Sequence, residues 1–190
     1  MAFELVVVGT SLGGLSALRN MLKDLPNDFS AAIAIVQHRH KESDITLANF
    51  LQQFTPLPVI EVEDKAKILP GHVYMAPANY HLLVEPGFFS LSTDEPVSYA
   101  RPSIDVMLES AADAYGSRLI AVLMTGANQD GVQGLVAVKR RGGVAIVQDP
   151  TTADCPVLPR AAIAAVSVDW VLPLSNLAAH LVYLCSAAGR

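Results

Sequence analysis

The sequence predicts an α/β protein with a doubly wound, mostly parallel sheet and helices on both faces, arranged in three αβα layers. Apolar runs of strand length alternate with segments of helical period along most of the chain, which is typical of βαβ units. The 190 residues correspond to a single domain over 1–190, at roughly 150 residues per domain. The hydrophobic share of 52% exceeds the about 45–50% of typical soluble chains, as expected for a sheet covered on both faces.

The first third of the chain predicts strands that alternate with helices. Leucines at helical spacing predict a helix from Leu15 to Leu25, which ends before Pro26. A second helix is expected around Ser43–Phe54, with Ser43 or Asp44 as its cap. Strands are expected before, between and after these helices, at Leu5–Val8, Ala31–Gln37 and Pro58–Val62.

The middle of the chain, about residues 67–97, has a different pattern. The turn signals Pro70-Gly71 and Pro86-Gly87 separate short runs of alternating apolar and polar residues. These runs are His72–Met75, Tyr80–Val84 and Phe88–Ser92. We predict that they form a β-hairpin region beside the main sheet.

The alternation of helices and strands resumes after this region. Helices are expected at Ser103–Tyr115, at about Gly131–Arg141, around Pro159 in a short alanine-rich segment, and from Leu177 to Ala188. Strands are expected at Leu119–Thr125, Val144–Gln148 and Asp169–Leu172.

Charge and cysteine content exclude several classes of protein. Thirteen basic and eighteen acidic side chains give a net charge of −5, and no basic run is longer than Lys139-Arg140-Arg141. This is too little positive charge for a surface that follows a phosphate backbone, so we expect no nucleic-acid partner. Cys155 and Cys185 have no C-x-x-C spacing, and we expect reduced thiols rather than a disulfide or a zinc site.

The mean hydropathy of +0.37 raises the question of a membrane protein. Continuous apolar stretches such as Leu119–Met124 and Ala31–Val36 are far shorter than the about 20 residues that cross a bilayer. The N-terminus contains Glu4 and leads directly into a strand pattern, whereas a signal peptide begins with basic residues and a longer apolar core. We therefore expect a cytoplasmic protein with no membrane insertion.

Three polar residues lie where predicted strands end. Ser11 follows the first strand, His38 follows the second, and Asp130 lies in the loop after Leu119–Thr125. Ligands of open parallel sheets bind at the carboxyl ends of the strands, so these side chains are expected to lie close together. A serine nucleophile, a histidine base and an orienting carboxylate form a catalytic triad.

The segment around Ser11 reads Gly9-x-Ser11-x-Gly13 between a strand and a helix, which is the spacing of a nucleophile elbow. A glycine-rich loop before a helix also suits an anion, and a merely tight turn is a further alternative. A dinucleotide fingerprint would need glycine at position 11, and a Walker loop would need a following Gly-Lys-Ser/Thr.

Other residues compete for the roles of base and carboxylate. His40 lies close to His38 in a polar loop, and the weaker candidates are His72, His81 and His180. Asp130 also suits an N-cap of the helix that follows it, and both roles can hold together. Other acids that could orient the histidine are Asp64, Asp105, Asp149 and Asp154.

Five motifs in the same order resemble a known family. They are Val6-Val7-Val8-Gly9-Thr10-Ser11-Leu12-Gly13-Gly14, Val36-Gln37-His38, Leu69-Pro70-Gly71-His72-Val73-Tyr74-Met75-Ala76-Pro77, Arg101-Pro102-Ser103-Ile104-Asp105, and Leu123-Met124-Thr125-Gly126 with Asp130-Gly131. Together they resemble the catalytic domain of the chemotaxis protein-glutamate methylesterases, the CheB family, from the first strand to the last helix.

The resemblance implies hydrolysis of the γ-carboxyl methyl ester of receptor glutamates with release of methanol, and in some cases deamidation of receptor glutamines. It assigns Ser11 as nucleophile, His38 as general base and then acid, and Asp130 as orienting carboxylate. The backbone N–H groups of Leu12 and Ala127 would form the oxyanion hole. It implies no metal or organic cofactor. The implied partners are the cytoplasmic helices of methylated chemoreceptors.

The sequence also departs from the family. Leu12 replaces a small hydroxyl residue, Ala127 a methionine, Asn128-Gln129 the pair Gly-Asn, and Arg39-His40 the pair Met-Pro. The family's receiver domain is absent from these 190 residues, so we expect a fragment, a protein that acts alone, or regulation by a separate protein. One alternative is a catalytically weak or inactive module that binds a receptor or an anion. Another is a nucleotide-dependent reductase on a flavodoxin-like sheet.

Overall fold

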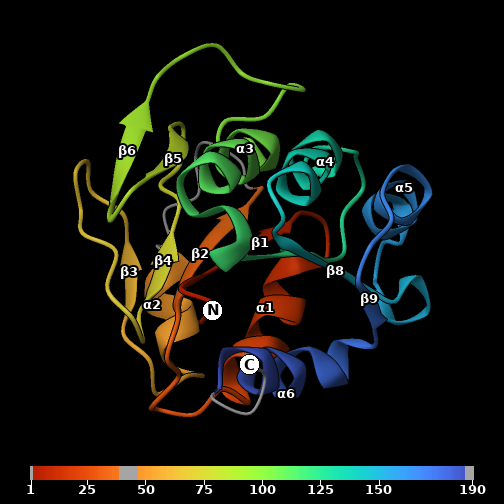
Figure 1. The fold of residues 1–190 in the computed structure, drawn as a ribbon, viewed down its shortest axis with the longest axis horizontal. Helices are drawn as coiled ribbons and strands as arrows, with labels where there is room; N and C mark the ends of the chain where they lie inside the picture. Colours follow the sequence, from red (N-terminus) through yellow and green to blue (C-terminus); the bar gives the residue numbers. More distant parts are fainter. Residues whose placement is uncertain (1, 39–46, 187–190) are drawn as a thin grey trace.

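Parallel strands form the central sheet of the computed structural model, which describes residues 2–38 and 47–186 (Figure 1). The order of the strands across this sheet is β3-β4-β2-β1-β7-β8-β9. Every neighbouring pair in it is parallel. The strands are β1 (Leu5–Thr10), β2 (Ala32–Gln37), β3 (Val59–Glu61), β4 (Val73–Met75), β7 (Leu119–Leu123), β8 (Val144–Gln148) and β9 (Trp170–Leu172).

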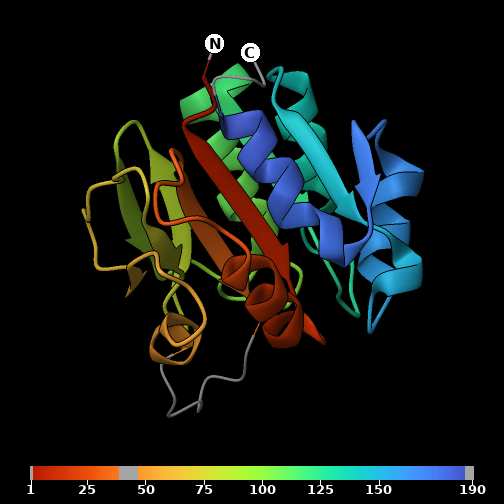
Figure 2. The ribbon, with the colours of Figure 1, turned by 90° about the horizontal axis from the view of Figure 1, so that it is seen from below.

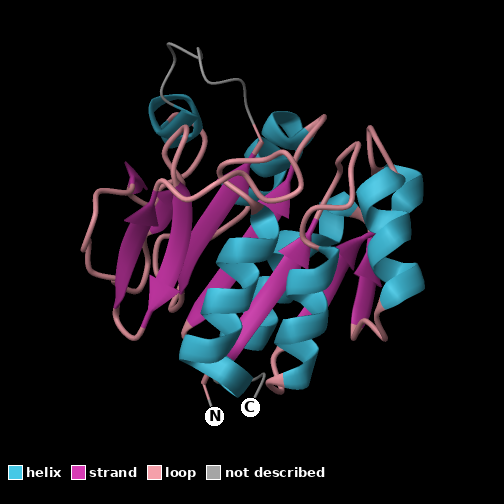
Figure 3. Cartoon of the chain, turned by 90° about the horizontal axis from the view of Figure 1, so that it is seen from above, coloured by secondary structure: helices cyan, strands magenta, loops and turns pink. Residues whose placement is uncertain are grey.

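Helices cover both faces of this sheet, as the sequence predicts. They are α1 (Gly14–Lys23), α2 (Leu47–Gln52), α3 (Ile104–Tyr115), α4 (Val132–Arg140), α5 (Val157–Ala165) and α6 (Leu174–Cys185), with short 3₁₀ turns at Gly116–Arg118 and Pro150–Thr152. Figure 2 shows α6, in blue, in front of the sheet, and Figure 3 shows helices packed on the opposite face.

The alternation of side chains along β1 divides the core into two layers. Leu5 and Val7 pack in one apolar cluster with residues of α3, α4 and α5. Val6 and Val8 pack in the other with residues of α1, α2 and α6. Successive strand residues point to opposite faces, so a strand buried on both faces is a continuous apolar run. The predicted α/β class and its three layers are confirmed.

The predicted hairpin is formed by β5 (His81–Glu85) and β6 (Phe88–Ser92), which pair antiparallel. The assignment of His72–Met75 to the same hairpin region was wrong, because β4 lies inside the main sheet between β2 and β3. Val73 and Met75 pack on one face and Tyr74 on the other, so the run is buried on both sides. The alternation of Tyr74 with Val73 and Met75 resembles the pattern of a strand with one exposed face, which is why the sequence predicted a hairpin strand here.

The remaining differences concern the bounds of elements. β1 extends to Thr10, two residues past the predicted Val8, because Gly9 and Thr10 still pair with β2. The predicted caps Ser43 and Asp44 lie outside the described residues. In the described ranges, no helix is long and apolar enough to span a membrane.

Candidate active site

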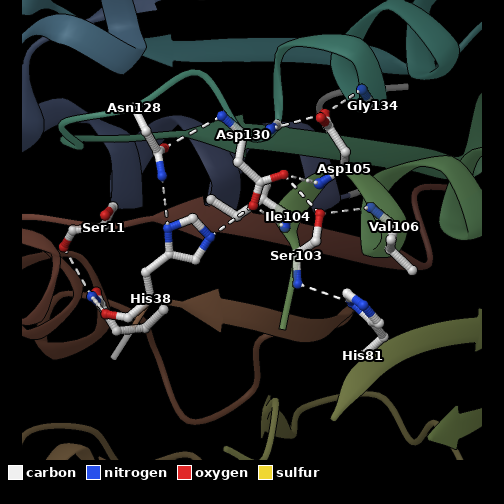
Figure 4. A network of polar contacts seen from close by, with 12 residues as sticks. Ser11, His38, His81, Ser103, Ile104, Asp105, Val106, Asn128, Asp130 and Gly134 are labelled. Atoms are coloured by element: carbon white, nitrogen blue, oxygen red, sulfur yellow. Dashed lines mark hydrogen bonds and ion pairs between the residues drawn. The ribbon is translucent and has the colours of Figure 1, made fainter. Parts of the chain in front are cut away.

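The register of the sheet places the ends of β1, β2 and β7 side by side. Thr10, the last residue of β1, pairs with Gln37 at the end of β2, and Gly9 pairs with Leu123 at the end of β7. Ser11, His38 and the loop that follows β7 therefore leave the sheet at one edge, and Figure 4 shows their side chains together.

Ser11 lies in a tight turn between β1 and α1. The Ser11 N–H donates to the Thr125 carbonyl oxygen at 3.0 Å, and the Gly14 N–H donates back to the Ser11 carbonyl oxygen at 2.9 Å. Gly13 has a φ of 80°, in the left-handed region that favours glycine. A Cβ on Gly14 would collide with Gln37 Oε1 and Thr10 Oγ1. The turn thus has the local geometry that the sequence predicts for a nucleophile elbow.

Buried polar side chains beneath Ser11 hold this turn in place. Gln37 Nε2 donates to the carbonyl oxygens of Ser11 at 2.9 Å and of His38 at 2.7 Å. Thr10 Oγ1 donates to the Thr125 carbonyl oxygen at 2.8 Å, and the Thr125 N–H donates to Gln148 Oε1 at 2.9 Å. The bonds from Gln37 to Ser11, from Thr10 to Thr125 and from Thr125 to Gln148 each join the ends of two different strands, so they fix the loops of the site relative to one another.

His38 contacts the carboxylate that the sequence predicts for it. His38 Nε2 lies 2.7 Å from Asp130 Oδ2, and the Asp130 side chain is fully buried whereas that of His38 is 14% exposed. Asp130 also accepts from Ser103 Oγ at 2.7 Å, from the Ile104 N–H at 2.7 Å and from the Asp105 N–H at 3.0 Å. Burial opposes ionisation, but the bonds from His38 and from these donors together hold the pKa of Asp130 below its usual value.

Asp130 does not cap the helix that follows it, so that part of the prediction was wrong. The N-cap of α4 is Gly131, which has no side chain to act as a cap. The Asp130 carboxylate instead accepts from the N-terminus of α3, at Ile104 and Asp105. Anionic side chains are favoured at helix N-termini, so α3 stabilises the charge on Asp130.

Asp105 makes the reciprocal contact. Its carboxylate Oδ1 accepts from the N–H groups of Gly131 at 2.9 Å and Gly134 at 2.7 Å, at the start of α4. Burial is the main cause that raises the pKa of Asp105 to about 6, and the nearby Asp130 charge adds to it. Asp105 thus links α3 to α4. It does not contact His38, so it is not the carboxylate that orients this histidine.

The other ring nitrogen of His38 contacts Asn128. Asn128 Nδ2 lies 3.2 Å from His38 Nδ1, and Asn128 Oδ1 accepts from the Asp130 N–H at 3.3 Å. Ser11 and His38 line the same open pocket of about 510 Å³, together with residues 12–16 and Gln37. In the described part of the chain, the Ser11 hydroxyl has no hydrogen-bond partner.

Leu12 follows Ser11 in the chain, and Gly126, the neighbour of Ala127, lies close to Ser11. Thr125 Oγ1 donates to the Leu12 carbonyl oxygen at 2.8 Å, which ties Leu12 to the loop after β7. A Cβ on Gly126, the neighbour of Ala127, would lie 3.1 Å from Ser11 Cβ. Neither the Leu12 nor the Ala127 N–H donates to another group within 2–38 and 47–186.

The competing histidines are engaged elsewhere. His72 Nδ1 contacts the Pro70 carbonyl oxygen at 2.8 Å, and the ring of His180 packs edge-on against Trp170. His81 Nδ1 accepts from the Ser103 N–H at 3.2 Å, so it lies behind Asp130 rather than in the pocket. His40 lies outside the described residues.

The competing acids have local roles. Asp64 accepts from the Leu91 N–H and Asp149 from the Thr151 N–H, while Asp154 lies against Gly13. Among the described residues, no group of three or more His, Cys, Asp or Glu is arranged to hold a metal ion.

Sequence reasoning did not assign roles to several residues of the site, namely Gln37, Ser103, Thr125 and Asn128. Ser103 is the N-cap of α3 and accepts from the Val106 N–H, and the same hydroxyl donates to Asp130. The predicted helix Ser103–Tyr115 included Ser103 as its first residue, and no pattern in the sequence indicates the contact with Asp130, 27 residues away.

Comparisons with known proteins show the family to which the chain belongs. A family model described as CheB methylesterase matches residues 6–181. The crystal structure of the Thermotoga maritima CheB methylesterase catalytic domain has a TM-score of 0.92 and 34% identity, covering 97% of this chain and 100% of that chain.

Two curated relatives differ in length. One from Leptospira interrogans is 45% identical over 185 residues, which cover 97% of this chain and 96% of the relative. The protein-glutamate methylesterase/protein-glutamine glutaminase 1 of Carboxydothermus hydrogenoformans is 41% identical, over 94% of this chain and 54% of its own length. The match thus spans nearly all of the first relative and about half of the second. The chain belongs to the CheB methylesterase family.

Proposed function

We propose that this protein is a serine hydrolase that removes methyl esters from the glutamate γ-carboxylates of chemoreceptors. The observation that carries the proposal is the 2.7 Å bond between His38 Nε2 and the buried Asp130 carboxylate, beside a pocket that Ser11 and His38 share. An imidazole anchored in this way is a general base, and a serine hydroxyl needs such a base to act as a nucleophile.

The residues have the following roles in the proposed reaction. Ser11 Oγ attacks the ester carbonyl carbon while His38 Nδ1 takes the hydroxyl proton, and Asp130 stabilises the imidazolium through Nε2. The N–H groups of Leu12 and Ala127 donate to the oxyanion, which is worth about 10²–10³ in rate per donor. His38 then returns the proton to the departing methoxide, and methanol leaves.

Water completes the cycle. His38 Nδ1 takes a proton from the water that attacks the acyl-serine, and returns it to Ser11 Oγ as the glutamate carboxylate is released. A receptor glutamine would follow the same course with ammonia as the leaving group. The name of the Carboxydothermus hydrogenoformans relative includes both activities, which supports this second reaction.

The proposed substrate is a side chain presented by a receptor helix in the cytoplasm. The pocket is open to solvent, and its rim includes Leu12, whose side chain is 62% exposed. An exposed apolar residue next to Ser11 suits contact with the apolar edge of a helix. Regulation by a separate protein stays a prediction.

A product assay tests the proposal and its alternative. Methanol from a methylated receptor fragment and ammonia from the matching glutamine fragment are measured with wild-type protein and Ser11→Ala. The wild type should release methanol and the variant none above the blank. Equal rates in the two proteins would refute Ser11 as the nucleophile, and receptor binding without turnover would favour the inactive module.

A further inference from the structure

The nitrogen of His38 that must accept the serine proton is already in a hydrogen bond. His38 Nε2 faces Asp130, so Nδ1 is the nitrogen left for proton transfer. Asn128 Nδ2 lies 3.2 Å from this Nδ1, and Figure 4 shows the amide and Ser11 on the same side of the ring. Asn128 lies in the loop between β7 and α4 and is half-buried.

The orientation of the Asn128 amide follows from its second contact. Its Oδ1 accepts from the Asp130 N–H at 3.3 Å, so the NH₂ group is the end that faces His38. An amide NH₂ can only donate, and His38 Nδ1 therefore has to be the acceptor. The proton of the neutral ring is then on Nε2, where it donates to Asp130.

This contact conflicts with catalysis. Nδ1 has one lone pair, and both the Asn128 N–H and the Ser11 O–H require it. When Nδ1 takes the serine proton, it becomes a donor that faces the donor of Asn128. The amide has to move away before or during this step, and the hydrogen bond that it makes is then lost.

We infer that Asn128 is a positioning residue that restrains the base: it fixes the proton of His38 on Nε2 and competes with Ser11 for Nδ1. This inference rests on the proposed function, since it concerns the same proton transfer. A hydrogen bond of ordinary net strength that is broken on the way to the transition state slows the reaction by about two- to tenfold.

The variant Asn128→Ser tests the competition. A serine hydroxyl at this position can still accept from the Asp130 N–H, as in other serine-stabilised turns, but it is too short to reach His38. The matched control is Gln129→Ala, because Gln129 is the exposed neighbour in the same loop. Labelling of Ser11 by a serine-directed phosphonate measures nucleophile activation without receptor binding. We expect Asn128→Ser to react about two- to tenfold faster than wild type, and Gln129→Ala to match wild type.

Imidazole ¹⁵N spectra give a second measurement that a loss of loop structure would not reproduce. The wild type should show a His38 Nδ1 that accepts a hydrogen bond and carries no proton, and Asn128→Ser should shift this signal alone. A labelling rate of Asn128→Ser that equals or falls below wild type, or a proton on Nδ1 in the wild type, would overturn the inference. If the phosphonate does not label Ser11 in the wild type, the proposed function is refuted instead. The spectra would still show whether Asn128 donates to His38 Nδ1.

Discussion

Replacement of Asp130 by asparagine separates the charge of the carboxylate from its shape. The carboxylate accepts from four donors, which are His38 Nε2, Ser103 Oγ and the N–H groups of Ile104 and Asp105. An asparagine has one oxygen and one NH₂ in their place. The Ile104 and Asp105 N–H groups bond to different oxygens of the carboxylate. In either orientation of the asparagine amide, one of these two N–H groups therefore faces the NH₂ group, which cannot accept a hydrogen bond.

The expected effects on stability and activity differ in size. A buried donor left without its acceptor costs about 1–3 kcal/mol of unfolding free energy. The effect on kcat is larger. An asparagine amide that donates to His38 Nε2 leaves the proton of the neutral ring on Nδ1, and a protonated Nδ1 cannot accept the proton of Ser11. Loss of the orienting carboxylate in a serine, histidine and aspartate triad lowers kcat by about 10⁴-fold.

Urea unfolding and methanol release measure the two effects on the same samples. The control is Asp64→Asn, because Asp64 is exposed and an asparagine oxygen can still accept from the Leu91 N–H. It should match the wild type in both assays. A folded Asp130→Asn protein with a kcat within tenfold of wild type would contradict the role of Asp130.

Three further predictions concern the support of the site. Ser103→Ala removes a donor to Asp130 and the cap of α3, so the unfolding free energy should fall by about 1 kcal/mol. Its kcat should fall less than that of Asp130→Asn. Urea unfolding and methanol release measure the two effects, and Ser103→Thr should restore both values. The pKa of Asp105 is raised from 3.8 to about 6, so the folded state binds its proton more tightly than the unfolded chain. The Asp105 contribution to the unfolding free energy should therefore fall as the pH rises from about 4 to about 6, and urea titrations of Asp105→Asn should lose this slope. Gly14→Ala places a Cβ against Gln37 Oε1 and Thr10 Oγ1 and should lower the unfolding free energy by about 1–3 kcal/mol; an unchanged thermal midpoint would contradict the close packing.

The sequence alone predicted the parts of the fold that depend on local patterns. The apolar runs of β1, β2, β7 and β8 and the helical spacing of α1, α3 and α4 are local properties, and each element lies within a few residues of its predicted bounds. The place of β4 depends on which strands it pairs with. Pairing partners are distant in sequence, so a short run between two turn signals does not reveal them.

The same distinction applies to the site. Ser11, His38 and Asp130 could be selected because the ends of parallel strands share one edge of the sheet. The crossed contacts of Asp130 with α3 and of Asp105 with α4 could not be predicted, because they join helices that are distant in the sequence. The sequence analysis noted Asn128 as a departure from the family. Its contact with His38 depends on the direction of the Asn128 side chain, which the spacing of apolar residues does not predict.

Identification of the residue modified by a serine-directed phosphonate tests the central claim most directly, since it reports which hydroxyl the base activates. The wild type and Ser175→Ala, a change on α6, should each gain one adduct that peptide mapping places on Ser11. Ser11→Ala should gain none, and His38→Ala should react at least about 10²-fold more slowly. An adduct on another residue, or equal labelling of His38→Ala, would contradict the account.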